Sequence, residues 1–243
     1  MNTSELDHTV PELGPGVYEH WRATTLGSIT ERIEQDVVLG HVGDVRGRRA
    51  LDIGCGDGVL AIELAKRGAA VVGLDADQAM LDAAHRRCQE AKADVTLCLG
   101  RAEQLPFDDD SFDLVVAVTI LCFVPQAEQT FAEIGRVLRP GGLLVIGELG
   151  KWSTWAARRR IKAWFGSPIW RAGHVRTPRE LKRLARAGGL IPRGVQGAVF
   201  YPHSDFAARH LHRLDPWLSA RTTLGAAFLT LTATRPAVSA SPH

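Results

Sequence analysis

The segment Leu51-Asp52-Ile53-Gly54-Cys55-Gly56-Asp57-Gly58 indicates the fold of the whole chain. It joins a short apolar stretch at 48–54, expected to be a buried strand, to a stretch at 57–68 with helical spacing. Glycine adopts positive φ readily and lets the backbone approach a ligand closely. In doubly wound sheets, ligands bind at the carboxyl ends of the strands. The segment therefore predicts a ligand site between the first strand of the sheet and the helix that follows it.

Strands and helices alternate on both sides of this segment. Apolar stretches that predict further strands lie at 70–75, 95–100, 112–119, 143–149, 194–202 and 225–235. Other helical patterns lie at 16–45, from Asp77 to about Lys92, from Gln126 to Leu138 before a turn at 139–142, and from Thr177 to Gly188. This alternation predicts βαβ units. We expect an α/β fold with a doubly wound, seven-stranded, mostly parallel sheet and an antiparallel C-terminal hairpin.

The length and composition favour one globular domain. The chain has 243 residues, a formal net charge of +2 and 45% hydrophobic residues. We expect an N-terminal tail and covering helices at 1–45, a single domain at 46–235 with a helical insertion at 151–176, and a disordered tail at 236–243. The four cysteines form no C-x-x-C pair, and the first residues lack a basic region followed by an apolar run. Both features favour a cytoplasmic protein with reduced thiols.

The charges around the glycines indicate which kind of ligand fits. The glycines are spaced G-x-G-x-G and Val59 follows them, so the G-x-G-x-x-G spacing of dinucleotide sites is absent. Asp52 and Asp57 would repel a pyrophosphate and attract a ligand with an ammonium and a sulfonium group, such as S-adenosylmethionine. Asp75 ends the second strand, where a carboxylate accepts hydrogen bonds from ribose hydroxyls. The alternative is a glycine turn with solvated acids and no ligand.

Four motifs resemble those of the class I S-adenosylmethionine-dependent methyltransferases. They are LDIGCGDG at 51–58, VVGLDAD at 71–77, GRAEQLPFDDDSFDLVVA at 100–117 and EIGRVLRPGGLLVIGE at 133–148. The resemblance is closest to the small-molecule branch that includes ubiquinone/menaquinone methyltransferase-like enzymes, and it covers about Tyr18 to Arg193. It implies a Rossmann-like fold, S-adenosylmethionine as cofactor with S-adenosylhomocysteine as product, and a helical acceptor cap formed by the insertion at 151–176.

The resemblance also implies the members of the cofactor pocket. Tyr18 and Trp21 would cover the cofactor, although the same aromatics would suit a helix packed on the sheet. The other implied contacts are Asp52, Gly54, Cys55, Gly56, Gly58 and Val118 around the methionine moiety, Asp75, Ala76 and Met80 around the ribose and adenine, and Arg101, Ala102 and Glu103 along the adenine edge. Relatives commonly carry aspartate in place of Arg101, and arginine accepts no hydrogen bond. Adenine would then be held by backbone, by Glu103 or by stacking.

Methyl transfer needs a general base only if the acceptor must lose a proton for attack. Glu148, His174 and Tyr201 are the candidates for such a base or for orienting the acceptor, and His203 is a further one. Glu148 has the strongest positional argument, because it ends the fifth strand at the ligand-binding edge. Each of them could instead be a structural or surface residue. The histidine spacing matches no metal site, so no metal is expected.

A basic, tryptophan-rich stretch follows the fifth strand. Residues 151–193 contain twelve lysines and arginines, one acid (Glu180) and four of the six tryptophans. The stretch could enclose a lipophilic acceptor, touch anionic lipid as a peripheral contact through 151–186, or contact RNA. It could also be a solvated helix whose tryptophans pack on the core.

The sequence therefore predicts an S-adenosylmethionine-dependent methyltransferase acting on a small, apolar or amphipathic acceptor such as a quinone, a lipid or a natural product. The alternatives are an RNA methyltransferase and a non-catalytic cofactor-binding protein. Nucleic acid is the less favoured partner, because the net charge is low and AVTILCFVP after the fourth strand lacks an NPPY-like motif. The acceptor atom and the oligomeric state stay open.

Overall fold

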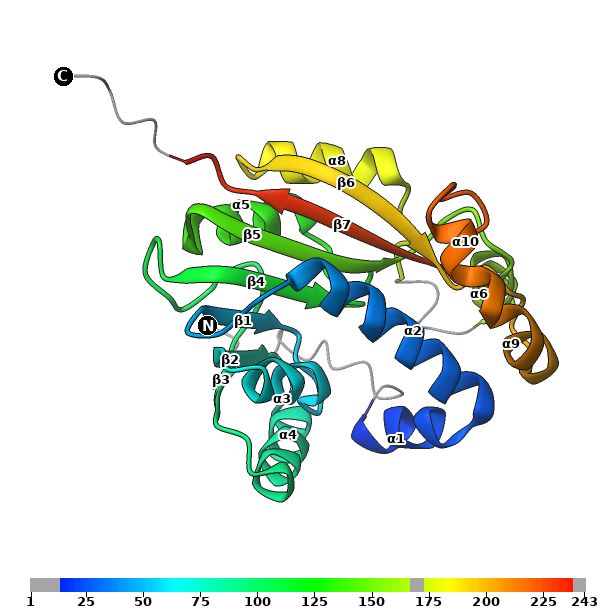
Figure 1. The fold of residues 1–243 in the computed structure, drawn as a ribbon, viewed down its shortest axis with the longest axis horizontal. Helices are drawn as coiled ribbons and strands as arrows, with labels where there is room; N and C mark the ends of the chain where they lie inside the picture. The colour runs from blue at the N-terminus through cyan, green and yellow to red at the C-terminus, as the bar shows by residue number, and fades with distance from the viewer. Residues whose placement is uncertain (1–13, 167–172, 238–243) are drawn as a thin grey trace, which may run out of the picture.

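The structure is a computed structural model that describes residues 14–166 and 173–237. A seven-stranded sheet crosses the molecule in the order β3-β2-β1-β4-β5-β7-β6 (Figure 1). The strands are β1 (Arg49–Ile53), β2 (Ala70–Asp75), β3 (Val95–Leu99), β4 (Phe112–Val118), β5 (Leu138–Leu149), β6 (Ile191–Ala198) and β7 (Phe228–Thr234). β1 to β5 run parallel, whereas β7 is antiparallel to both β5 and β6. The predicted mostly parallel sheet with antiparallel C-terminal strands is confirmed.

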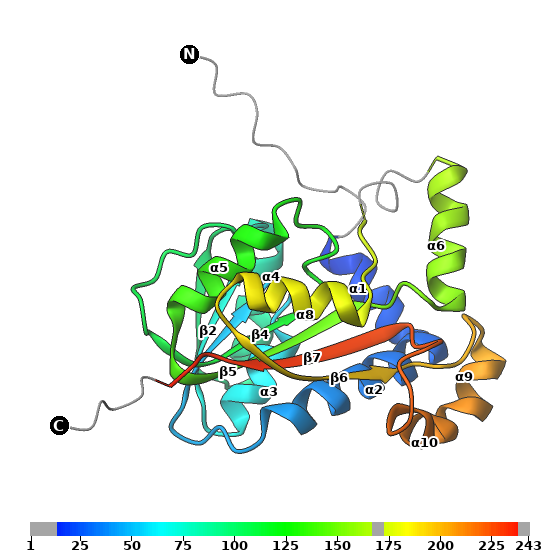
Figure 2. The ribbon, with the colours of Figure 1, turned by 90° about the horizontal axis from the view of Figure 1, so that it is seen from above.

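Helices cover both faces of the sheet, which explains why the strands are largely apolar. The helices are α1 (Pro15–Ala23), α2 (Thr25–Val42), α3 (Val59–Lys66), α4 (Gln78–Ala91), α5 (Ala127–Val137), α6 (Thr154–Trp164), α8 (Pro178–Ala187), α9 (Asp205–Leu211) and α10 (Asp215–Ser219). α5 and α8 pack on one face, and α2 and α3 on the other (Figure 2). The parallel crossovers leave the carboxyl ends of β1, β2, β4 and β5 together at one edge.

The helical pattern predicted at 16–45 consists of two helices, α1 and α2. α1 ends at Ala23, and Thr24 begins α2 by accepting a hydrogen bond from the Gly27 amide at 2.9 Å. α1 buries none of its residues fully, so it is a surface helix separate from the core-packed α2. Residues 1–13 and 238–243 of the predicted tails lie outside the described part of the chain.

The turn predicted at Arg139-Pro140-Gly141-Gly142 lies within β5, where the register with β4 shifts between Leu138 and Leu143 and Gly141 has φ of 81°. β5 begins at Leu138 and includes all four residues. The Gly141 amide donates to the Arg235 carbonyl oxygen at 3.1 Å, and the Arg235 amide donates to the Gly142 carbonyl oxygen at 3.0 Å. The glycines therefore form a bulge inside β5, which pairing with Arg235 holds in place.

The connection between β6 and β7 is longer and more helical than a hairpin turn. β6 ends before Tyr201, and α9, the 3-10 helix His212–Leu214 and α10 precede β7. The buried Asp215 carboxylate accepts the amides of Val199 at 2.7 Å and Phe200 at 2.8 Å. This contact holds the helical connection against the end of β6. α9 and α10 thus gather with α6 at one end of the sheet (Figures 1 and 2).

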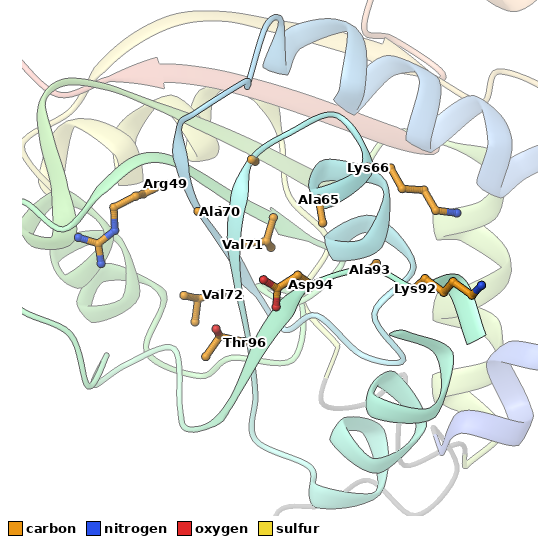
Figure 3. A pocket seen from close by; sticks show the side chains of 11 residues that line it. Arg49, Ala65, Lys66, Ala70, Val71, Val72, Lys92, Ala93, Asp94 and Thr96 are labelled. Carbon is orange, nitrogen blue, oxygen red and sulfur yellow. The ribbon is translucent and has the colours of Figure 1, made fainter. Parts of the chain in front are cut away.

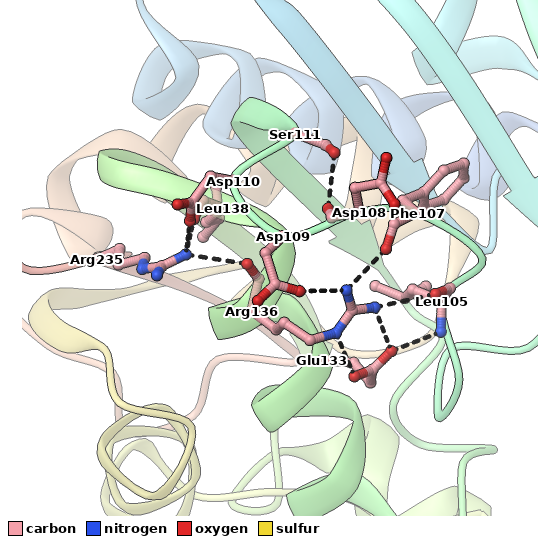
Figure 4. A network of polar contacts seen from close by, with 10 residues as sticks. All are labelled: Leu105, Phe107, Asp108, Asp109, Asp110, Ser111, Glu133, Arg136, Leu138 and Arg235. Carbon is pink, nitrogen blue, oxygen red and sulfur yellow. Dashed lines mark hydrogen bonds and ion pairs between the residues drawn. The ribbon is translucent and has the colours of Figure 1, made fainter.

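A polar network fixes the loop between β3 and β4, which carries the predicted adenine contacts. Arg136 of α5 donates to the carbonyl oxygens of Leu105 at 3.0 Å and Phe107 at 2.7 Å (Figure 4). It also donates to Glu133 and Asp109, each at 2.8 Å. Glu133 in turn accepts the Leu105 amide at 2.8 Å, and the hydrogen bond from Arg136 contributes most to lowering its pKa. These hydrogen bonds therefore anchor the loop to α5.

Candidate functional site

The glycine-rich loop after β1 lies across the carboxyl ends of β1 and β2. The amides of Gly54 and Cys55 both donate to the Leu74 carbonyl oxygen, at 2.7 and 3.0 Å. Gly54 has φ of 69°, and a Cβ there would collide with Ile120. Gly58, with φ of 82°, caps α3 in the left-handed conformation. Glycine is required at both positions because other residues are strained at these φ values.

Asp75 ends β2 and organises the same loop. Its Oδ2 accepts the Gly56 amide at 2.8 Å, and its Oδ1 accepts the Asp77 amide at 3.0 Å. Each carboxylate oxygen has a further lone pair, so both can still accept hydrogen bonds from a ligand. Among the described residues, no atom lies within 4 Å of where a Cβ on Gly56 would be. Open space therefore adjoins the loop beside a carboxylate that can accept ribose hydroxyls.

Two buried carboxylates flank the loop, and the protein neutralises only one of them. Asp57 is ion-paired with Arg22 of α1 and, at 2.9 Å, with Arg87 of α4. Asp52 is 2% exposed, and its Oδ2 has no hydrogen-bond partner in the described part of the chain. Burial, and then the charge of Asp75, raises the pKa of Asp52 to about 7. The electrostatic prediction is corrected here: Asp52 and Asp75 attract a cationic ligand, whereas Asp57 is already paired.

These carboxylates fit a cationic nucleoside that carries no phosphate. A buried carboxylate without a partner is costly unless a donor reaches it. The ammonium group of a methionine moiety would supply that donor to Asp52, and ribose hydroxyls would reach Asp75. A pyrophosphate in the same place would face two uncompensated carboxylates. The donor set therefore fits S-adenosylmethionine.

The predicted adenine side combines buried apolar groups with an ion pair. Met80 of α4 and Ala102 are buried, whereas Ala76 is exposed. Arg101 is exposed and forms an ion pair with Glu103 at 3.2 Å. Glu103 thus has a protein partner of its own, and its contact with adenine stays a prediction.

α1 contacts both the cofactor loop and the neighbouring part of the site. Burial, followed by the charges of Cys122 and the carboxylates of Asp75 and Asp57, raises the pKa of Tyr18 to about 12. Tyr18 therefore lies near the loop and near the segment after β4. The Trp21 ring meets Trp155 of α6 edge-on, with centroids 6.1 Å apart, and lies 6.0 Å from the His203 ring. The covering role predicted for Tyr18 and Trp21 fits this position.

Glu148 is fully buried at the end of β5, beside the end of β4. Its Oε1 accepts the Leu149 amide at 2.6 Å, whereas its Oε2 has no hydrogen-bond partner among the described residues. Burial raises the pKa of Glu148 to about 7, against the opposite effects of the Leu149 amide and Arg176. Val118, predicted to lie near the methionine moiety, is half-buried and pairs with Gly147 on the adjacent strand. A carboxyl group of this pKa can accept a proton near neutral pH.

Ionisable groups that the sequence did not indicate surround Glu148. Burial and the charge of Glu148 raise the pKa of the Cys122 thiol. Arg176 donates to the Leu121 carbonyl oxygen at 3.1 Å and also acts on Glu148. Arg159 of α6 acts electrostatically on both Glu148 and Glu34, and burial raises the pKa of Glu34 of α2 to about 8. These residues come from four distant segments, so no local pattern could have found them.

The other catalytic candidates occupy different settings. The His174 amide donates to the Cys122 carbonyl oxygen at 2.8 Å, but His174 is exposed. Tyr201 is buried, its hydroxyl bonds to the Thr30 hydroxyl of α2 at 2.9 Å, and burial raises its pKa to about 12. His203 packs against Trp155 with ring centroids 4.5 Å apart. The hydroxyl of Tyr201 is therefore already hydrogen-bonded to Thr30, whereas Oε2 of Glu148 has no hydrogen-bond partner among the described residues.

A hollow of about 390 Å³ lies at the opposite edge, around the amino ends of β1, β2 and β3 (Figure 3). Arg49, Lys66 and Lys92 line it together with Asp94. Lys66 and Lys92 end α3 and α4, where a positive charge suits the helix dipole. The hollow is thus separate from the glycine-rich loop. The described residues contain no group of three or more His, Cys, Asp or Glu that could hold a metal ion, and no helix among them could span a membrane.

Several known proteins with similar sequences are methyltransferases. A family profile described as "Methyltransferase domain" matches residues 51–146. The ubiquinone biosynthesis O-methyltransferase of Alkalilimnicola ehrlichii is 31% identical over 175 residues, which cover 69% of this chain and 70% of that protein. The enzyme of the same name from Methylococcus capsulatus is 32% identical over 167 residues, covering 64% of this chain and 68% of that protein.

Solved methyltransferase structures share the fold. A SAM-dependent methyltransferase from Thermotoga maritima has a TM-score of 0.68 and 22% identity, covering 90% of this chain and 95% of its own. Magnesium protoporphyrin IX methyltransferase from Synechocystis, with bound S-adenosylhomocysteine, has a TM-score of 0.66 and 17% identity, covering 93% and 96%. Fold, loop chemistry and sequence relatives agree. The chain belongs to the class I S-adenosylmethionine-dependent methyltransferases and is an enzyme that uses this cofactor.

Proposed function

We propose that the protein transfers the methyl group of S-adenosylmethionine to a hydroxyl oxygen of a small, apolar or amphipathic acceptor of the phenol or quinol type. The observation that carries this proposal is the fully buried Glu148, whose Oε2 has no hydrogen-bond partner among the described residues and whose pKa is about 7. A hydroxyl becomes a strong nucleophile only when it loses its proton. A base of this pKa beside the site matches that requirement.

In the proposed methyl transfer, Glu148 acts as the general base. The bound cofactor supplies an electrophilic methyl group. Glu148 accepts the hydroxyl proton at Oε2 as the acceptor oxygen forms its bond to the methyl carbon. The carbon–sulfur bond breaks, and its electron pair stays on sulfur in S-adenosylhomocysteine. The rest of the protein orients the acceptor and keeps water away from the reacting atoms.

Aromatic residues near this carboxyl group favour an apolar acceptor. The charge of Cys122 acts on Tyr18 of α1, and Arg159, which also acts on Glu148, lies 5.7 Å from the ring centroid of the buried Trp155 of α6. Trp21 of α1 packs edge-on against this Trp155 ring. Flat aromatic side chains favour ring-shaped ligands over extended polar chains. The names of the sequence relatives, which contain ubiquinone and O-methyltransferase, support the same acceptor class.

A methyl-transfer screen tests the proposal. The protein is incubated with S-adenosylmethionine labelled in its methyl group and with three probes: a catechol carrying a prenyl tail, the same compound with both hydroxyls already methylated, and transfer RNA. We expect label in the free catechol alone, recovered as a methyl ether. Transfer to RNA, or equal transfer to the fully methylated compound, would contradict a hydroxyl acceptor.

A binding control separates an inactive enzyme from a wrong probe. Calorimetry with S-adenosylmethionine and S-adenosylhomocysteine shows whether the preparation is competent. Tight binding without transfer to any hydroxyl-bearing probe, across tails of different length, would favour a non-catalytic cofactor-binding protein instead.

A further inference from the structure

Large apolar side chains are exposed at the end of the molecule where α6, α9 and α10 gather (Figures 1 and 2). Of the twelve exposed large hydrophobic residues in the described part of the chain, nine lie here: Trp152, Ile161, Trp164, Phe165, Phe206, Leu211, Leu214, Trp217 and Leu224. Trp164 is 85% exposed and Phe165 is 84% exposed. Concentrated exposure of this kind marks an interaction surface.

Two segments distant in sequence form this end together. The Gly225 amide donates to the Trp152 carbonyl oxygen at 2.9 Å, which joins the loop before β7 to the start of α6. Trp155 of α6 packs against His203, just before α9. The start of α6 therefore adjoins the β6–β7 connection, whereas the far end of α6, which carries Trp164 and Phe165, projects away from α9 and α10 (Figure 2).

The same surface carries a positive charge. Arg158, Arg160 and Lys162 of α6 are exposed, and residues 152–166 contain no acid. Arg209, Arg213 and Arg221 add exposed cations from the β6–β7 connection, and the Arg221 guanidinium lies 4.4 Å from the Trp217 ring centroid. Of the two acids of this connection, Asp215 is buried against Val199 and Phe200. Asp205 is exposed and accepts the Leu26 amide at 3.2 Å, so the exposed cations of this connection outnumber its exposed acid. We call these apolar and cationic side chains the aromatic-basic face.

We propose that the aromatic-basic face binds the surface of membranes that contain anionic lipid. Tryptophan and phenylalanine beside arginine and lysine are the composition of interfacial helices, whose apolar side chains enter the headgroup region while the cations meet lipid phosphates. A second copy of the chain fits less well, because a symmetric contact of this face would bring arginines against arginines. The proposal does not rest on the identity of the methyl acceptor.

The inner side of α6 links the aromatic-basic face to the methyl-transfer site. Trp155 is buried on that helix, and Arg159 acts on Glu148. One helix thus borders the methyl-transfer site on its inner side and the aromatic-basic face on its outer side. An apolar acceptor dissolved in the bilayer would need only a short path from the membrane to the site.

Vesicle flotation with the full chain tests the proposal. Vesicles of phosphatidylcholine, with or without phosphatidylglycerol, are mixed with the protein at low and high salt. We expect binding only to the vesicles that contain phosphatidylglycerol, and weaker binding at high salt because the contact is partly electrostatic. Arg158→Gln with Arg160→Gln should lower the partition coefficient at least tenfold, since each cation contributes about fivefold.

Matched variants separate a local surface from general charge. Trp164→Ser with Phe165→Ser should reduce binding without changing net charge. Lys66→Gln with Lys92→Gln removes the same charge at the hollow of Figure 3, so it should leave binding unchanged. Circular dichroism and cofactor binding verify that each variant is folded.

Three outcomes would overturn the proposal. One is absence of the natural protein from the floated anionic vesicles. Another is equal loss of binding in the Lys66/Lys92 and Arg158/Arg160 variants. A third is concentration-dependent dimerisation in sedimentation that the Trp164/Phe165 variant abolishes, without vesicle binding, which would make the face a contact between copies. None of these readouts depends on catalysis, so failure here leaves the proposed function standing.

Discussion

Glu148→Gln keeps the size of the buried side chain at the end of β5 but removes its charge. The pKa of Glu148 is about 7 in the folded protein, compared with 4.5 for the exposed side chain. Because the folded pKa is raised, the stability linked to this group is complete below about pH 4.5 and is lost as the pH rises through 7. At about 1.4 kcal/mol per pKa unit, the free energy of unfolding should fall by about 3 kcal/mol over that range. The glutamine variant should not show this loss.

The same substitution should lower methyl transfer about a hundredfold or more at pH 8, which is the usual contribution of a general base. With a pKa of about 7, roughly one tenth of Glu148 is ionised at pH 6 and roughly nine tenths at pH 8. Turnover of the natural protein should therefore rise about tenfold between these values. Turnover of the variant should lack this rise, so the difference between the two proteins should grow with pH.

The assay combines initial rates across this pH range, at saturating cofactor, with urea unfolding of the ligand-free protein at acidic and alkaline pH. Glu128→Gln on the exposed surface of α5 is the matched control, because it removes the same charge away from the site. Parallel pH–rate profiles in the variant and the natural protein would refute the assignment of Glu148 as base. A difference in unfolding free energy that does not change with pH would refute burial as the cause of its raised pKa.

Three further predictions concern the cofactor loop. Asp75→Ala should weaken S-adenosylmethionine binding at least tenfold by calorimetry, because the Gly56 amide of the loop, the Asp77 amide and the ribose lose their acceptor. Asp82→Ala on the exposed face of α4 should not weaken it, and equal affinities of the two variants would remove the ribose assignment. Gly54→Ala should lower the melting temperature and abolish cofactor binding, because φ is 69° there, while Gly40→Ala in α2 should be tolerated; a native melt for Gly54→Ala would contradict the strained loop. Cofactor affinity should fall up to about tenfold per pH unit below pH 7 as Asp52 takes up a proton; a flat affinity from pH 5 to 8 would exclude Asp52 as the ammonium partner.

The sheet and its cofactor loop were predictable because their signals are local. The apolar stretches at 48–54 and 70–75 flank a segment with helical spacing, so this alternation indicates a βαβ unit directly. The left-handed φ values at Gly54 and Gly58 are conformations that glycine favours. Asp75 follows from its place at the end of an apolar strand.

The contacts that complete the site were not predictable, because they join distant segments. Asp57 pairs with Arg22, 35 positions away, and with Arg87, 30 positions away. No spacing rule specifies either partner, and the sequence alone suggested that Asp57 would face a ligand. The helical connection between β6 and β7 was missed for the same reason, since Asp215 holds it in place through amides that precede it by 16 and 15 positions.

The pairing of Asp57 changes the explanation of ligand selectivity. If both loop carboxylates were solvated, they would repel phosphate only weakly, because water screens exposed charges. Instead Asp57 is neutralised by two arginines, and the charge without an ion-pair partner is concentrated on the buried Asp52 and the half-buried Asp75. In low dielectric, this pair repels itself, which contributes to the raised pKa of Asp52. A bound cation relieves that repulsion, whereas a bound phosphate would add to it. We therefore expect the loop to select a cationic nucleoside chiefly through the carboxylates of Asp52 and Asp75 at the ends of β1 and β2, while the ion pairs of Asp57 hold the loop against α1 and α4.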